Sequence, residues 1–201
     1  MIARRNEIEQ LVDDALVDWK LLRGADISGD EFQVGDIVRV SVDRGQGDTL
    51  TRLVVVTHVD LNERHFSFLL SHFDAEFVTS TDVLVPRLMA KVFADLVVET
   101  DLFGSAFLSQ VDQKFGHLDD SIMREVLAHQ RGSDISPASL LKTGTVIHGE
   151  FDEKWSFKED EARSAMLIKA DFLRSLLAEF GDGKPAFAIA LQDDLRGADL
   201  E

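Results

Sequence analysis

Apolar positions change their spacing twice along the chain, and the changes predict a helical start, a strand-rich middle and a helical end. Within residues 6–22 the apolar side chains recur every three or four positions, at Ile8, Leu11, Val12, Ala15, Leu16, Trp19 and Leu22. This spacing predicts an amphipathic helix, which Gly24 ends. The apolar stripe needs a surface to cover it, either the body of the protein or a second copy of the chain.

From residue 33 onward the pattern is that of short strands separated by turns. Apolar segments that predict strands lie at 34–42, 53–56, 65–70, 83–85, 95–98 and 106–108, and a turn is expected at Phe103-Gly104-Ser105. No helical pattern separates these segments, which argues against the alternating strand–helix winding of parallel sheets. Strands of this length and spacing favour a small antiparallel barrel or a strongly bent sheet.

Helical spacing returns near residue 119. Asp119 or Asp120 is expected to cap a helix that Gly132 ends, and Ser136-Pro137 predicts the start of a second, short helix. A strand at 145–148, a long helix at about 158–180 and a last strand at 187–191 follow. The predicted fold class is α+β, with a helix and connector at 1–32, a small antiparallel β-barrel at 33–132 and a β-α-β extension at 133–201.

The composition is that of a globular protein with a strong acidic excess. The 201 residues include 21 Lys and Arg against 37 Asp and Glu, a net charge of −16, and no cysteine. Disulfides, thiolate metal sites and cysteine nucleophiles are therefore excluded. No apolar run has the length of a membrane span, and the N-terminus leads into a charged helix, so we expect a cytoplasmic protein without membrane contact. The acidic field repels nucleic acid and favours a basic partner.

Residues 37–72 differ from the rest of the chain because their charges cancel. Four arginines and four acids stand in this stretch: Arg39, Arg44, Arg52, Arg64, Asp43, Asp48, Asp60 and Glu63. A surface that tolerates a polyanion is expected here before anywhere else. The alternative interpretation is a local fluctuation in composition with no functional meaning.

Two His-x-Asp pairs invite a metal-site interpretation. His58 with Asp60, and His72 with Asp74, each place an imidazole and a carboxylate on one side of an extended segment. Such donors suit a hard divalent cation, but they are also ordinary polar residues at strand ends. We expect the second case, with no metal and no cofactor.

Two further segments have simple structural explanations. The glycines Gly45 and Gly47 precede a strand, whereas a phosphate-binding glycine loop needs a helix directly after it, so a nucleotide cradle is not expected. Residues 150–161 are rich in acids and are expected to form a loop before a helix, whose dipole favours acids at its start. Within them, Trp155 and Phe157 are expected to anchor the loop to the core; the alternative is an aromatic spot that binds a partner.

Four segments follow one another in a distinctive order. They are Gly35-Asp36-Ile37-Val38 at the opening of a strand, a glycine-bearing loop at 43–50 that leads into Arg52-Leu53-Val54-Val55-Val56, a strand at 66–71, and Phe107-Leu108-Ser109-Gln110-Val111 followed by Phe115-Gly116-His117-Leu118 before a helix. In this order they resemble the MazF/PemK family of toxin endoribonucleases, whose fold is a small SH3-like barrel. The resemblance covers residues 33–130, about half of the chain.

The resemblance implies a metal-independent endoribonuclease, or a relative that has lost catalysis, acting on single-stranded RNA as a homodimer. Arg52 would stabilise charge on the scissile phosphate, because a guanidinium stays charged and binds two phosphate oxygens. Ser71 would position the phosphate or assist proton transfer, and the 2′-hydroxyl of RNA would be the nucleophile. His72, next to Ser71, is our own candidate for a general acid or base, since an imidazole titrates near working pH.

A second interpretation is a non-catalytic interaction module on the same barrel. The charge of −16 motivates it, as does Leu53, which stands where the family carries a proline. The groove would then bind a basic protein, with an affinity that falls as salt is added. The surroundings of Arg52 distinguish the two cases, because a positive groove favours RNA and a negative one favours the module.

Overall fold

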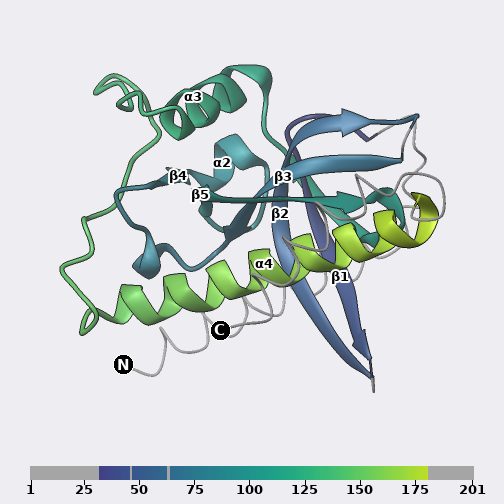
Figure 1. The fold of residues 1–201 in the computed structure, drawn as a ribbon. Helices are drawn as coiled ribbons and strands as arrows, with labels where there is room; N and C mark the ends of the chain where they lie inside the picture. The colour runs from purple at the N-terminus through teal and green to yellow at the C-terminus, as the bar shows by residue number, and fades with distance from the viewer. Residues whose placement is uncertain (1–31, 46, 63, 181–201) are drawn as a thin grey trace, which may run out of the picture.

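The computed structural model describes residues 32–45, 47–62 and 64–180 (Figure 1). The helix predicted at 6–22 and the last strand predicted at 187–191 lie outside these residues. The described chain forms six strands, β1 (Asp36–Gly45), β2 (Asp48–Asp60), β3 (His65–His72), β4 (Asp82–Val85), β5 (Leu96–Phe107) and β6 (Val111–His117). The helices are α2 (Arg87–Ala90), α3 (Asp120–Gln130) and α4 (Glu153–Phe180), with short 3-10 turns at Ala75–Phe77 and Leu108–Gln110. The α+β class predicted from the sequence is thus confirmed.

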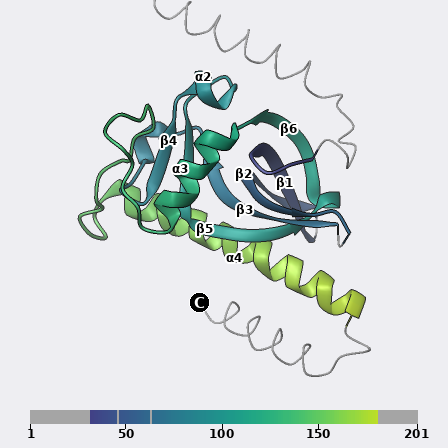
Figure 2. The same cartoon turned by 90° about the horizontal axis from the view of Figure 1, so that it is seen from above.

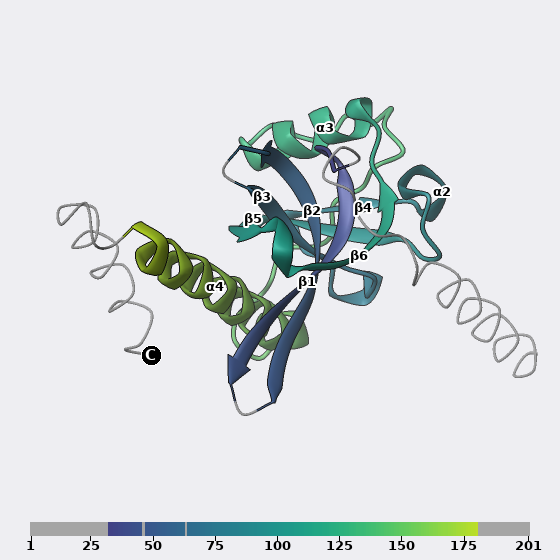
Figure 3. The same cartoon turned by 90° about the vertical axis from the view of Figure 1, so that its right-hand side faces the viewer.

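The strands form one antiparallel sheet in the order β4-β5-β3-β2-β1-β6. The prediction of a closed barrel is wrong, because no pairing between β4 and β6 joins the two edges in the described part of the chain. β4 has only four residues, and β5 is the one described strand it pairs with, so β4 covers only the first part of the longer β5. β5 also lies beside α4 (Figure 2). At the other side of the sheet the β1–β2 hairpin extends away from the remaining strands (Figure 3).

β5 is one continuous strand, so the predicted turn at Phe103-Gly104-Ser105 is wrong. Instead of a turn, β5 has a shift in its register against β3: Leu69 pairs with Phe103, whereas the next residue, Leu70, pairs with Glu99. Gly104 has a packing role, since a Cβ added there would lie 2.8 Å from the Phe68 ring. A glycine inside a strand often marks such a close approach rather than a turn.

The sheet separates two apolar clusters, because successive side chains of a strand point to opposite faces. One cluster joins Ile37, Val55 and Leu69 to α3, through Ile122, Met123 and Val126. The other joins Val38, Val54 and Leu70 to α4, through Ala165 and Ile168. Each face of the sheet is thus covered by one of the two longer helices.

The segment between α3 and α4 departs from its prediction. Asp119 is the N-cap residue of α3, as expected, but its carboxylate accepts a hydrogen bond from Lys91 Nζ and not from the helix backbone. The helix predicted at Ser136-Pro137 and the strand at 145–148 are both wrong. The backbone there bonds to the free edge of β4, where Leu84 and Lys142 exchange hydrogen bonds of 2.7 and 3.2 Å. Backbone N–H and C=O groups that bond to the edge of a sheet cannot also form the hydrogen bonds of a helix.

The long C-terminal helix begins earlier than predicted. α4 starts at Glu153, so part of the expected acidic loop is helical. Phe157 is anchored as expected, stacked on Phe77 with ring centroids 4.4 Å apart, whereas Trp155 remains 42% exposed. In the described ranges no helix is both long and apolar enough to cross a membrane.

Candidate functional site

The register of β2 and β3 decides which predicted site residues share a face. Leu53 pairs with Ser71 and Val54 with Leu70. Because side chains alternate along a strand, Arg52 and His72 lie on the face of Val54 and Leu70, which α4 covers. Ser71 lies on the opposite face, beside Leu53. The structure therefore brings together Arg52 and His72 and separates both from Ser71.

Arg52 is held by a carboxylate of α4. Its Nε lies 3.2 Å from Glu161 Oε2, and its Nη1 donates to the carbonyl of Thr51 at 3.0 Å. The Arg52 side chain is 29% exposed and that of Glu161 only 11%. Burial raises the pKa of Glu161, and the attraction of Arg52 opposes this shift. The guanidinium at this position is thus already neutralised by an anion from its own chain.

His72 lies beneath the first turns of α4. Its ring meets Phe157 edge-on, with centroids 4.8 Å apart. Its Nδ1 accepts a hydrogen bond from the backbone N–H of Asp74 at 3.2 Å, so the neutral ring carries its proton on Nε2, which is buried without a hydrogen-bond partner among the described residues. Burial lowers the pKa of His72 to about 4. The imidazole is therefore neutral at neutral pH.

Ser71 is placed in the apolar layer of the other face. It is 2% exposed, and its hydroxyl makes no hydrogen bond within the described part of the chain. Its strand partners are Leu53 on one side and Val98 on the other. The sheet itself stands between this hydroxyl and Arg52.

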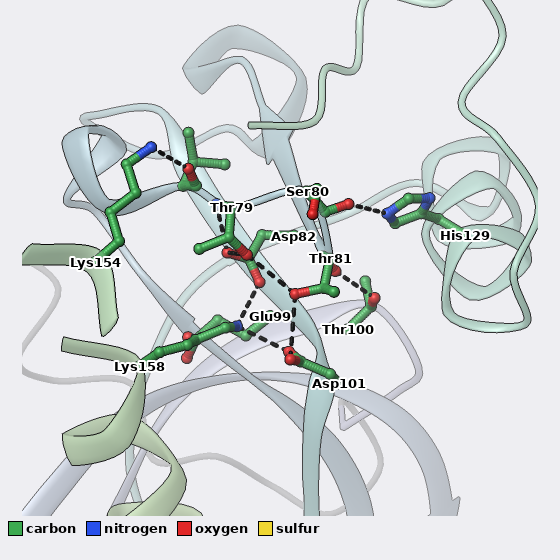
Figure 4. A network of polar contacts seen from close by, with 11 residues as sticks. Thr79, Ser80, Thr81, Asp82, Glu99, Thr100, Asp101, His129, Lys154 and Lys158 are labelled. Carbon is green, nitrogen blue, oxygen red and sulfur yellow. Dashed lines mark hydrogen bonds and ion pairs between the residues drawn. The ribbon is translucent and has the colours of Figure 1, made fainter. Parts of the chain in front are cut away.

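Next to Arg52 and His72, Lys158 of α4, whose side chain is 13% exposed, joins three carboxylates of β4 and β5 (Figure 4). Lys158 Nζ lies 2.6 Å from Asp82, 3.0 Å from Glu99 and 2.8 Å from Asp101. Asp82 also accepts hydrogen bonds from the N–H and hydroxyl of Thr79, at 2.8 and 2.7 Å. We call Lys158 with these three carboxylates the Lys158 cluster.

Two members of the Lys158 cluster, Glu99 and Lys158, have shifted pKa values. Burial raises the pKa of Glu99 to about 7, although Lys158 acts in the opposite direction. Burial alone would lower the pKa of Lys158, but the attraction of Glu99 and Asp82 outweighs it and raises this pKa above its ordinary value. Lys158 therefore stays charged and ties α4 to the two strands.

Sequence reasoning missed the residues of α4 that complete this region. Phe157, Lys158 and Glu161 form one face of the helix, with the spacing i, i+1 and i+4. A signal was present in the sequence, because Asp82 and Glu99 stand directly beside the apolar segments 83–85 and 96–98. An acid buried at such a position pairs with a cation or takes up a proton.

The two His-x-Asp pairs do not converge. His58 pairs with Ser67, five positions from His72 along β3, a separation of roughly 16 Å at the usual strand rise. Across the described residues, no group of three or more His, Asp or Glu side chains is arranged to hold a metal ion.

Comparison with known proteins gives matches at the level of structure only. No protein-family model matches the chain, and no curated protein has significant sequence similarity to it. Among solved structures, an endoribonuclease in complex with its cognate antitoxin from a mycobacterial species is 13% identical, with a TM-score of 0.35 over 52% of this chain and 97% of that one. Mycobacterium tuberculosis toxin MazF-mt6 is 14% identical, with a TM-score of 0.36 over 50% of this chain and 99% of the toxin.

Proposed function

We propose that this protein is a MazF/PemK-like ribonuclease that binds single-stranded RNA at Arg52 and His72 and cleaves it without a metal ion. The observation that carries the proposal is the pairing of Arg52 with the carboxylate of Glu161 beside a neutral imidazole. A guanidinium that holds one buried anion is suited to hold another, because the same N–H donors bind the oxygens of a carboxylate or of a phosphate.

In the proposed reaction the 2′-hydroxyl of RNA attacks the adjacent phosphorus and the 5′-oxygen leaves. Arg52 stabilises the negative charge that builds on the phosphate oxygens, which is the largest single contribution in many enzymes. His72 takes the proton of the 2′-hydroxyl and returns it to the departing 5′-oxygen. Because burial lowers its pKa to about 4, the ring begins the reaction in the neutral form that this role requires. Ser71 faces the other side of the sheet, so it is left out of the proposed site.

The test is incubation of the purified protein with single-stranded RNA in the presence of a chelator, comparing wild type with Arg52→Ala. Arg44→Ala is the matched control, because Arg44 is an exposed arginine of the neighbouring strand that pairs with Asp48. We expect cleavage by wild type and by Arg44→Ala, and its loss in Arg52→Ala. Absence of cleavage both by wild type and by Glu161→Gln, in which the carboxylate paired with Arg52 is removed, would remove the enzymatic proposal.

One observation favours a second candidate, a non-catalytic module that binds a basic protein. The cation at Arg52 is neutralised by Glu161, and the adjacent Lys158 cluster holds three carboxylates for one ammonium. Together with the net charge of −16, this leaves a region that repels a polyanion. Binding of an oligolysine peptide that weakens with added salt, with no RNA binding at the same salt, supports this candidate.

A further inference from the structure

The first turns of α4 lie directly over Arg52 and His72. Glu161 contacts the guanidinium, and Phe157, one turn earlier, contacts the imidazole. Any ligand that reaches these two side chains from the α4 side must therefore displace this part of the helix. The cover belongs to the same chain, so it is present at every protein concentration.

This part of α4 is held mainly by charges and ring contacts, and the following part by apolar burial. No residue from 153 to 160 is buried, and the two buried residues between 161 and 164 are the polar Glu161 and Ser164. The apolar residues that the protein buries along α4 come later, at Ala165, Ile168, Ala170 and Phe172. Segments with few buried apolar contacts open at a lower free energy than the rest of a protein. The N-terminal turns of α4 can therefore separate from the sheet while the part from Ala165 to Phe172 stays packed.

The contact at Arg52 is also one that an anion can replace. Glu161 offers a carboxylate to Arg52, and a phosphodiester offers the same charge with two oxygens arranged for a guanidinium. Lys158 lies within the same turns, so its ion pairs with Asp82 and Glu99 open together with the contact at Arg52. The attachment that remains is the apolar burial of Ala165 and Ile168. A bound polyanion would therefore compete with Glu161 while α4 keeps its anchor in the core.

We propose that the first turns of α4, residues 153–164, are a removable intrachain cover that inhibits the Arg52–His72 site, with Glu161 occupying the position of the RNA phosphate. This inference rests on the proposed function, because the competing ligand is taken to be RNA. It adds that the protein as folded is a restrained form, whose activity depends on the equilibrium between covered and uncovered states.

The test compares Glu161→Gln with Glu159→Gln in the full chain. The two variants make the same change of charge on the same helix, but Glu159 is exposed and Glu161 holds Arg52. Two quantities are measured, hydrogen–deuterium exchange of the α4 amides and binding of a fluorescein-labelled single-stranded RNA of about 12 nucleotides. Thermal unfolding of each variant shows that it is folded.

We expect Glu161→Gln to speed exchange at residues 157–164 and to tighten RNA binding by about tenfold or more relative to Glu159→Gln, since a partly buried charge pair is worth at least about this factor. Adding Arg52→Ala to Glu161→Gln should abolish the gain. In wild type, residues 157–164 should exchange faster than residues 168–176, an expectation that needs no variant.

Each other outcome has a distinct meaning. Equal exchange of residues 157–164 in Glu161→Gln and Glu159→Gln, or equal protection of both halves of α4 in wild type, overturns the cover. A gain in RNA binding that survives Arg52→Ala also overturns it, because the uncovered site would then be elsewhere. Faster exchange with no gain in RNA binding overturns the proposed RNA function and leaves the cover standing.

Discussion

Replacement of Glu99 by glutamine should change how the stability of this protein depends on pH. The side chain is fully buried, and burial raises its pKa from the ordinary 4.5 to about 7. Below about pH 4.5 the residue is protonated in both the folded and the unfolded chain. Between about pH 4.5 and pH 7 the folded protein binds one more proton at Glu99 than the unfolded chain does, so the free energy of unfolding falls as the pH rises.

The size of this effect follows from the interval between the two pKa values. Each pH unit between them corresponds to about 1.4 kcal/mol, so the ionisation of Glu99 removes about 3 kcal/mol by neutral pH. His72 acts in the opposite direction, because burial lowers its pKa from 6.5 to about 4. Its stability contribution is present above pH 6.5 and is lost as the pH falls toward 4. In wild type the two effects largely cancel between pH 4.5 and 6.5.

Glu99→Gln removes one of the two opposing effects. The free energy of unfolding of the variant, relative to wild type, should therefore rise by about 3 kcal/mol between pH 4.5 and pH 8. Urea unfolding followed by circular dichroism at one-unit pH intervals measures it, and Glu159→Gln, an exposed residue of α4, should follow wild type. A Glu99→Gln profile parallel to that of wild type would show that Glu99 titrates normally and that the argument from burial is wrong.

Three other predictions follow from the packing. Ile168→Ala should lower the free energy of unfolding by about 2–5 kcal/mol in urea titration, because the side chain is fully buried, whereas Met166→Ala on the same helix, at a residue that is 44% exposed, should change it little. Gly104→Ala should destabilise by about 1–3 kcal/mol, since the new methyl would lie 2.8 Å from the Phe68 ring; an unchanged melting temperature contradicts this. Sedimentation at tens of micromolar should give a homodimer, in which a second copy supplies one of the two surfaces that could cover the apolar stripe predicted at 6–22, and a monomer would refute it.

The strands were the part of the fold that local pattern predicted best. β1, β2, β3 and β4 lie where alternating or continuous apolar residues indicated them, because that pattern reflects burial on one or both faces of a sheet. The failures have long-range causes. Gly104 was taken for a turn residue, but it makes room for Phe68 of another strand. The segment after Ser136 was taken for a helix, but its backbone bonds to the free edge of β4.

The candidate site shows the same division. The separation of Ser71 from His72 was available in the sequence, because neighbouring residues of a strand face opposite sides. The meeting of Arg52 with Glu161 was not, since more than a hundred residues separate them and the pairing depends on where α4 crosses the sheet. The Lys158 cluster depends in the same way on three elements, β4, β5 and α4.

The sequence by itself determined the α+β class and the acidic character, and it gave Arg52, Ser71 and His72 as candidate residues. These properties depend on composition and on short-range periodicity, which each segment carries independently of the others. The tertiary structure alone decided that the sheet stays open and that Arg52 is covered by a carboxylate of its own chain. Both depend on contacts between segments far apart in the chain, and such contacts are set by the packing of the whole protein rather than by any local preference.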